Sequence, residues 1–157
     1  MPGARILLVE DDEVLRELIL RNLERRGHDV CIAEDAQTAL AHLRTAPFDL
    51  ILLDICLPDQ TGWEVLRTAQ KEGRLTPVEI HEDSGKLPVV VLSAVRVSQS
   101  RLQEFHPLAY LPKPFPMDAL LRLAAEAAAR RNGDAVHLQE ENESAEESLQ
   151  YVEDTYA

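Results

Sequence analysis

The stretch LILLDICLPDQTG, residues 50–62, joins an apolar run to an acidic residue and a turn. Four apolar residues lead directly into Asp54, and the chain then turns at Pro58 and Gly62. A short apolar run that ends in turn residues is typical of a strand buried on both faces of a sheet. A buried carboxylate without a partner is costly. Either a cation neutralises Asp54, therefore, or this acid has a chemical role.

Short apolar runs alternate with segments of helical periodicity along most of the chain. The runs predict strands at residues 5–9, 29–33, 49–54, 87–93 and 109–111. The periodic segments predict helices at residues 13–26, 35–43, 62–71, 98–105 and 116–131, of which the fourth is weak. This alternation favours an α/β fold whose parallel sheet is covered on both faces. Five such units fit a doubly wound open sheet better than a closed eight-fold barrel.

Composition restricts the class of protein. The chain has 157 residues and a net charge of −12, which fits one domain with an appendage and argues against a nucleic-acid binder. No apolar run reaches the roughly 18 residues of a membrane helix, and the N-terminus does not resemble a signal peptide. Cys31 and Cys56 have neither disulfide nor metal spacing. We therefore expect a cytoplasmic protein.

Polar side chains gather where the predicted strands end. Glu10 and Asp11 follow the first strand, Asp54 ends the third, Ser93 ends the fourth and Lys113 follows the fifth. In doubly wound sheets the carboxyl ends of the strands form the binding site. Clustered carboxylates repel one another unless a cation lies among them, and oxygen-rich sites suit Mg²⁺. Together with a lysine and a hydroxyl, such a cluster favours phosphoryl transfer to a carboxylate nucleophile.

Taken together, four segments are similar to the receiver domain of two-component response regulators. They are ILLVEDD (6–12), DLILLDICLPDQTG (49–62), VVVLSA (89–94) and YLPKPF (110–115). The resemblance extends from residue 5 to about residue 131. It implies the flavodoxin-like receiver fold, a five-stranded parallel sheet in the order 2-1-3-4-5.

The resemblance also implies a role for each acid. Asp54 corresponds to the phosphoacceptor, which takes a phosphoryl group from a phosphohistidine. Glu10, Asp11 and Asp54, with the backbone carbonyl of Cys56, correspond to the Mg²⁺ ligands, and no organic cofactor is expected. Asp12 is expected at the start of a helix rather than on the metal.

The remaining matched residues imply a switch. Ser93 corresponds to the hydroxyl that moves onto the phosphoryl group, Tyr110 to the aromatic ring that then turns inward, and Lys113 to the lysine of the site. Pro114 corresponds to the family's cis proline. The face formed by the fourth helix, the fifth strand and the fifth helix is expected to change between two states that a partner reads.

The implied partners are a sensor histidine kinase or a histidine phosphotransfer protein, and a downstream protein of unknown identity. A homodimer through the switching face is a further expectation, whereas direct binding to nucleic acid or membrane is not expected. The protein is expected to be a regulatory phosphoacceptor, which catalyses only its own phosphorylation and dephosphorylation, rather than an enzyme. A phosphorelay intermediate and a degenerate receiver that only binds proteins are alternatives.

Two enzyme or carrier classes with similar patterns are disfavoured. Hydrolases and phosphotransferases with an aspartate nucleophile commonly have a second acid two residues later, where this chain has Cys56. A flavin carrier needs a hydroxyl- and glycine-rich phosphate loop after the first strand, where residues 10–12 are all acidic and would repel a phosphate.

The predicted domain organisation is a receiver over residues 1–132 and an acidic tail over 133–157, which is either disordered or an amphipathic helix. These lengths predict a stand-alone receiver. The interval from Asp54 to Ser93 is longer than is usual in the family, and the surplus lies around residues 71–87. It is either an added hairpin or a long loop, and either a tolerated surface insertion or a determinant of partner specificity.

Overall fold

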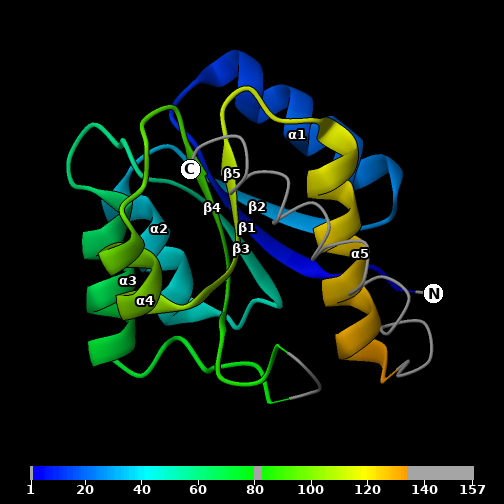
Figure 1. Cartoon of the computed structure of the whole chain (residues 1–157). Coiled ribbons are helices and arrows are strands. Elements are labelled where there is room, and N and C mark those ends of the chain that lie inside the picture. The colour runs from blue at the N-terminus through cyan, green and yellow to red at the C-terminus, as the bar shows by residue number, and fades with distance from the viewer. Residues whose placement is uncertain (1, 80–82, 134–157) are drawn as a thin grey trace.

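A computed structural model of the chain describes residues 2–79 and 83–133. Five parallel strands form a single sheet in the order β2-β1-β3-β4-β5, as Figure 1 shows. They are β1 (Arg5–Val9), β2 (Asp29–Ala33), β3 (Leu50–Asp54), β4 (Leu87–Ser93) and β5 (Pro107–Pro112). The predicted doubly wound parallel sheet and its strand order are therefore confirmed.

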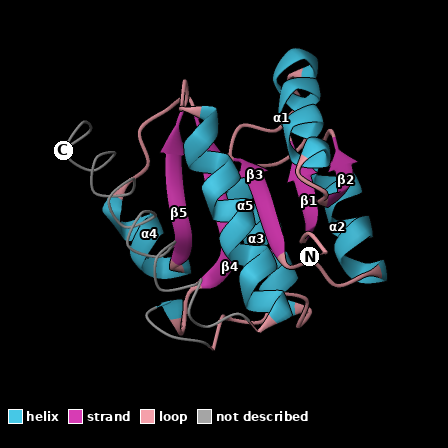
Figure 2. Ribbon diagram, turned by 90° about the vertical axis from the view of Figure 1, so that its right-hand side faces the viewer, coloured by secondary structure: helices cyan, strands magenta, loops and turns pink. Residues whose placement is uncertain are grey.

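Within the part of the chain that the structure describes, five helices cover the two faces of this sheet. They are α1 (Glu13–Arg25), α2 (Ala36–Thr45), α3 (Gly62–Lys71), α4 (Gln99–Phe105) and α5 (Met117–Asn132). Helices α1 and α5 lie on one face and α2, α3 and α4 on the other (Figure 1). Figure 2, turned by 90°, shows α5 lying across the strands. Among the described residues, no helix is both long enough and apolar enough to cross a membrane.

Strand β3 lies at the centre of the sheet, between β1 and β4, and all five of its residues are buried. A continuous apolar run suits this place because helices cover both faces and every side chain of the strand meets a core. Full burial of each leucine or isoleucine side chain stabilises the fold by about 1.5–3 kcal/mol. The same strand carries Asp54 into this interior, where only 3% of the residue is exposed.

Short polar side chains begin the first two helices. The Asp12 carboxylate accepts a hydrogen bond from the Leu15 backbone N–H at 3.1 Å and caps α1. Asp35 accepts one from the Thr38 N–H at 2.7 Å and caps α2. Aspartate is among the preferred N-cap residues because its oxygen satisfies an otherwise free N–H in the first turn. The expected position of Asp12 at a helix start is therefore observed.

A second carboxylate reaches α2 from the loop after β3. Asp59 accepts hydrogen bonds from the backbone N–H groups of Ala36, at 2.9 Å, and Gln37, at 3.0 Å. The bond from Ala36 is the main cause that lowers the pKa of the Asp59 carboxyl below its ordinary value. The loop that follows Asp54 is thereby joined to the helix beside it. Sequence analysis did not anticipate this contact, because it links residues more than twenty positions apart.

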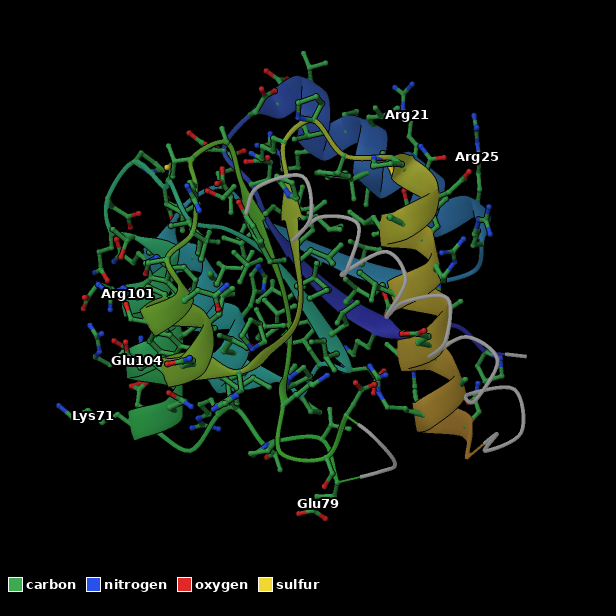
Figure 3. The ribbon with its side chains drawn as sticks, viewed as in Figure 1. Arg21, Arg25, Lys71, Glu79, Arg101 and Glu104 are labelled. Carbon is green, nitrogen blue, oxygen red and sulfur yellow. The ribbon has the colours of Figure 1, made fainter. Side chains whose placement is uncertain are left out.

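Helix α4 is as short as the sequence suggested, and aromatic and charged contacts hold it against α3. The rings of Trp63 and Phe105 stack with their centroids 5.4 Å apart and their planes at 17°. Glu104 accepts hydrogen bonds from Arg67 of α3, at 3.0 Å, and from Arg101, at 3.1 Å. Figure 3 shows Arg101 and Glu104 side by side on the outer surface of α4. The buried ring stack contributes more than these exposed ion pairs, each worth at most about 1 kcal/mol.

Strand β5 begins two residues earlier than the sequence predicted. His106 ends α4 in the left-handed conformation, with φ of 49°, and turns the chain back toward the sheet. Its carbonyl accepts the Leu87 N–H at 2.7 Å, and Pro107 then pairs with Leu87. Proline is tolerated here because β5 is an edge strand, on which an N–H can be absent without loss of a ladder bond.

The segment between α3 and β4 forms a long loop rather than a strand pair, as far as residues 72–79 and 83–86 show. The Val78 N–H donates to the Lys86 carbonyl at 2.8 Å and closes the base of the loop. Asp83 pairs with Lys86 at 3.2 Å and contacts Arg130 of α5 at 3.7 Å. Both alternatives for the whole segment stay predictions, and its residue Asp83 lies against α5.

His28 links the N-terminal edge of the sheet to the residue before β1. Its Nδ1 accepts a hydrogen bond from the Ala4 backbone N–H at 2.9 Å, and the ring is buried. Burial, with a smaller contribution from the charge of Arg26, lowers the pKa of His28 below 6.5. The folded protein therefore prefers the neutral ring.

We predict that His28 makes the fold less stable as the pH falls below about 6.5, because the unfolded chain takes up the proton first. The contribution of the neutral ring is complete above that pH and is lost toward the lower folded pKa. The variant His28→Asn keeps an acceptor oxygen but cannot titrate. Urea unfolding at pH values from about 7.5 to about 5 should give a smaller fall in the free energy of unfolding for this variant. Equal falls would contradict the prediction.

Candidate functional site

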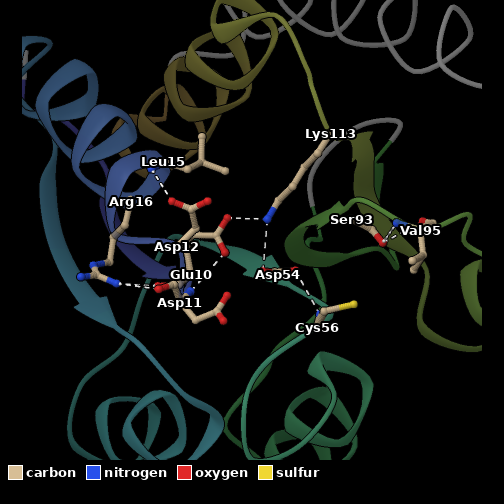
Figure 4. Close-up of polar contacts among 10 residues, drawn as sticks. All are labelled: Glu10, Asp11, Asp12, Leu15, Arg16, Asp54, Cys56, Ser93, Val95 and Lys113. Carbon is tan, nitrogen blue, oxygen red and sulfur yellow. Dashed lines mark hydrogen bonds and ion pairs between the residues drawn. The ribbon is translucent and has the colours of Figure 1, made fainter.

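The carboxyl ends of four strands meet at one edge of the sheet and bring four polar side chains together. Glu10 follows β1, Asp54 ends β3, Ser93 ends β4 and Lys113 follows β5 (Figure 4). Lys113 is 103 residues from Glu10 and 59 from Asp54, yet it contacts both. A parallel sheet produces this arrangement because all its strands end at the same edge.

Three carboxylates form a cluster at this edge. Glu10, Asp11 and Asp54 each offer an oxygen, and these oxygens lie within 4.8 Å of one another. Glu10 and Asp54 are buried, whereas Asp11 is exposed. Hard divalent cations such as Mg²⁺ prefer oxygen ligands and keep several waters, which an exposed acid at the mouth of the cluster permits. The donor set therefore fits Mg²⁺.

Lys113 lies between the two buried acids. Its Nζ is 2.5 Å from Oε1 of Glu10 and 3.1 Å from Oδ2 of Asp54. Burial and the hydrogen bond with Asp54 raise the pKa of Glu10 to about 8, and the contact with Lys113 offsets only part of this rise. Burial alone would lower the pKa of Lys113, but its bonds to Glu10 and Asp54 outweigh burial and raise it. Burial is thus the main cause of the raised pKa of Glu10, and one lysine does not offset it.

The turn after β3 fixes the other oxygen of Asp54. The Cys56 backbone N–H donates to Oδ1 of Asp54 at 3.0 Å, so each oxygen of this carboxylate has a partner. The turn needs glycine at position 62, since a Cβ there would lie 2.7 Å from the Asp54 carbonyl oxygen. The Cys56 side chain itself is exposed.

Ser93 and Tyr110 meet at the backbone of Val95, in the loop after β4. The Ser93 hydroxyl donates to the Val95 carbonyl at 2.7 Å and accepts the Val95 N–H at 3.1 Å. The Tyr110 hydroxyl donates to the same carbonyl at 3.4 Å, and its ring is buried. Between residues that the structure describes, no hydrogen bond joins Ser93 to Asp54. The two predicted switch residues are therefore close to each other, and both are bound to one loop carbonyl.

The lysine of the site precedes a cis peptide bond, Lys113–Pro114, as the resemblance implied. Asp12, the next acid after Asp11, caps α1 and is not part of the carboxylate cluster.

Sequence analysis missed one residue of the site, Arg16. Its guanidinium donates to the backbone carbonyl of Glu10 at 3.0 Å and makes a longer contact of 3.4 Å with that of Asp11. A signal was present, because Arg16 lies three residues before Ile19 and seven before Leu23, on the buried face of α1. A charged residue in an apolar stripe indicates a specific partner.

Comparisons with known proteins agree with this geometry. A family model described as "Response regulator receiver domain" matches residues 6–125. The transcriptional activator protein PfeR of Pseudomonas aeruginosa is 37% identical over 131 residues, which cover 78% of this chain and 39% of that protein. The chain spans from 25% to 52% of the length of the curated relatives. The expected stand-alone receiver therefore stays a prediction.

Solved structures give the same result. The receiver domain of the Francisella response regulator 1452 superposes with a TM-score of 0.69 at 26% identity, covering 82% of this chain and 99% of that one. The response regulator protein TrrA of Thermotoga maritima, solved in complex with Mg²⁺-BeF, gives a TM-score of 0.61 at 27% identity, covering 81% and 99%. With a family match that spans the sheet and most of α5, the chain belongs to the response regulator receiver domains of two-component signalling.

Proposed function

We propose that this receiver domain accepts a phosphoryl group on Asp54 from a phosphohistidine of a partner protein and then switches a protein-binding face. The observation that carries the proposal is the placement of Asp54, a buried carboxylate bound by Lys113 inside a cluster of three acids. Burial of a charged carboxylate costs free energy, and a chemical role explains why the fold places one here.

The proposed step is a displacement at phosphorus. An oxygen of Asp54 forms a new bond to phosphorus while the bond from phosphorus to the histidine nitrogen breaks, and the nitrogen keeps the electron pair. The Cys56 N–H and Lys113 orient the carboxylate through their bonds at 3.0 Å and 3.1 Å. Lys113 also supplies a positive charge for one phosphoryl oxygen. The domain thereby catalyses only its own phosphorylation and the later hydrolysis.

Glu10, Asp11 and Asp54, with the backbone carbonyl of Cys56, would hold Mg²⁺, which neutralises charge on the phosphoryl oxygens when bound. The cluster of three oxygens supports this assignment. So does the raised pKa of Glu10, because a cation beside this buried carboxyl would favour its ionised form. The solved complex of TrrA with Mg²⁺-BeF is an independent support from a similar fold.

The switch would begin at Val95. A phosphoryl group on Asp54 adds acceptor oxygens, to which the Ser93 hydroxyl can donate instead of to the Val95 carbonyl. Loss of that bond would leave the Tyr110 hydroxyl on this carbonyl and free the loop that leads to α4. The surface formed by α4, β5 and α5 would then change between two states, as in other proteins where a modification orders or releases a loop.

Two surfaces suit the proposed partners. Helix α1 exposes Val14 to 80% and Leu18 to 51%, and it begins two residues after Asp11, so that an incoming histidine protein can dock beside the site. The α4-β5-α5 face would bind the downstream protein or a second copy of the chain. The expectation of a cytoplasmic protein is kept as part of this proposal.

We infer that residues 1–132 form the receiver domain, since α5 ends at Asn132 and its buried residues extend from Ala119 to Ala129. The proposed acidic tail over residues 133–157 lies outside the described residues except for Gly133. The loop around residues 71–87, whose Asp83 contacts α5, would then be a surface addition at the edge opposite the acids. A phosphorelay intermediate would use the same chemistry at Asp54, whereas a degenerate receiver would not need the intact cluster.

Incubation with a small phosphodonor and Mg²⁺ should give one acid-labile or base-labile phosphate per chain, which the variant Asp54→Asn cannot form. Intact-mass spectrometry measures the adduct. The matched control is Asp12→Asn, which removes a neighbouring carboxylate but keeps a good N-cap, and it should form the adduct normally. An adduct on Asp54→Asn, or repeated turnover of added phosphate esters by the wild type, would refute the proposed function.

The acids after β1 should differ in their effect on cation binding. Asp11→Asn removes one charged ligand and should weaken Mg²⁺ binding at least about tenfold, equivalent to about 1.4 kcal/mol. Asp12→Asn should change the dissociation constant by less than about twofold, because Asp12 caps α1. Titration calorimetry measures both constants, and similar losses in the two variants would contradict the assignment.

Lys113 should oppose cation binding and yet support the reaction. Its ammonium group occupies the carboxylates of Glu10 and Asp54, and competes with a divalent cation for them. Lys113→Met should therefore bind Mg²⁺ more tightly than the wild type but accept phosphate from the small donor more slowly. Weaker Mg²⁺ binding, or an undiminished rate of adduct formation, would show that the lysine acts otherwise.

A further inference from the structure

We propose that Arg16 is a positioning residue of the metal site, whose guanidinium holds the backbone at Glu10 and Asp11 so that the Asp11 carboxylate faces Asp54. This inference rests on the proposed function, because it concerns the residues that would hold the cation. It assigns a role to a side chain of α1 that touches no phosphoryl group and no ion.

The contacts of Arg16 reach both sides of the loop after β1. Nη1 donates to the Glu10 carbonyl at 3.0 Å, an ordinary hydrogen bond, and makes a longer contact of 3.4 Å with the Asp11 carbonyl. Nη2 pairs with Glu34, in the loop after β2, at 3.3 Å. Figure 4 shows the guanidinium beside the backbone of Glu10 and Asp11. One side chain thus connects α1 with the loops that follow two strands.

Burial of the Arg16 guanidinium carries a desolvation penalty, which an apolar side chain at the same position would avoid. Its side chain is 10% exposed, and it falls on the buried face of α1 with Ile19 and Leu23. An apolar side chain would pack at such a position without the desolvation penalty of a guanidinium. Because Arg16 binds carbonyls and the distant Glu34, it leaves the carboxylates of the cluster free for a cation. Nη2 therefore pairs with Glu34, while Nη1 binds the backbone of the site.

Asp11 is the acid that needs such support. Lys113 holds the buried Glu10, and both Lys113 and Cys56 hold Asp54. The Asp11 carboxylate is exposed and has no hydrogen bond or ion pair with any residue within 2–79 and 83–133. Its direction is consequently set by its backbone.

Three groups fix that backbone. The Glu10 N–H donates to the Ala33 carbonyl at 3.0 Å, the Asp11 N–H donates to Oε2 of Glu10 at 3.1 Å, and Arg16 binds the two carbonyls. Of these three, only the arginine contact can be removed by a side-chain substitution outside the acids themselves. The planar fork of arginine can reach two carbonyls and a carboxylate at once, which the single ammonium group of lysine cannot.

The test compares two variants that each lose one positive charge from α1. Arg16→Met removes the proposed support, and Arg21→Met removes an arginine that is 68% exposed and pairs with Glu17 of the same helix. Figure 3 shows Arg21 pointing away from the body of the protein. The dissociation constant for Mg²⁺ is measured on the full chain from the backbone amide shifts of residues 10 and 11 during a titration. This readout needs no phosphoryl transfer.

We expect Arg16→Met to weaken Mg²⁺ binding roughly 10–100-fold, the range for groups that orient metal ligands, and Arg21→Met to stay within about twofold of the wild type. The sign is decisive. Loss of a positive charge by itself strengthens the attraction of an acidic site for a cation, so a weaker site shows loss of geometry. Arg16→Met binding as tightly as the wild type, or more tightly, overturns the proposal.

Two further measurements separate positioning from general loss of structure. Arg16→Lys keeps the charge and most of the packing, and it should still bind Mg²⁺ at least about threefold more weakly; full recovery overturns the proposal, and this variant decides if Arg16→Met does not fold. The double variant Arg16→Met with Asp11→Asn should lose less affinity than the two single losses combined, because both act through Asp11. Additive losses would show that Arg16 does not act through Asp11. A wild-type chain without saturable Mg²⁺ shifts overturns the proposed function instead.

Discussion

The ion pairs of Lys113 with Glu10 and Asp54 are the interaction on which the site depends. Two carboxylates lie inside the protein, and an unpaired charge in that place costs several kcal/mol. The lysine offsets part of this free-energy cost through its contacts of 2.5 Å with Glu10 and 3.1 Å with Asp54. The pKa of Glu10 is nevertheless raised to about 8, mainly by burial and by its hydrogen bond with Asp54. Because a nearby positive charge favours the ionised carboxylate, the cluster is suited to a further cation.

The fold supplies the geometry for these contacts. Because the strands are parallel, residues that follow β1, β3 and β5 meet at one edge although the chain separates them widely. The apolar sequence of β3 carries Asp54 into the core, and the closely approached Gly62 turns the chain immediately behind it. The burial and the position of Asp54 thus follow from β3 and the turn that comes after it.

Local patterns were sufficient to predict most of the fold from the sequence. The apolar runs predicted β1, β2 and β4 with the bounds that the structure shows, because a buried strand appears in the sequence as a short run of apolar residues. The early start of β5 was not predicted, since it follows from the left-handed turn at His106 and from pairing with Leu87 across the sheet. Neither contact has a signature in neighbouring residues.

The candidate site divides in the same way. Its acids, serine and lysine were predicted because each follows a recognisable strand. Arg16 was not, and neither was the contact of the nearby Asp59 with α2, because the partners of both are backbone groups whose positions only the folded chain defines. The sequence does contain a signal for Arg16, which is a charged residue in the apolar stripe of α1. It contains no signal for the contact of Asp59, since aspartate is common in turns.

A crystal structure of the chain with Mg²⁺ and beryllofluoride would test the central claim most directly, which is that side chains from separate strand ends gather around the Asp54 carboxylate and one divalent cation. The account predicts beryllofluoride on the Asp54 carboxylate, the cation held by Glu10, Asp11, Asp54 and the Cys56 carbonyl, and Ser93 turned from Val95 toward the fluorides. Beryllofluoride elsewhere, or Asp11 and Asp54 facing different parts of the molecule, would contradict it.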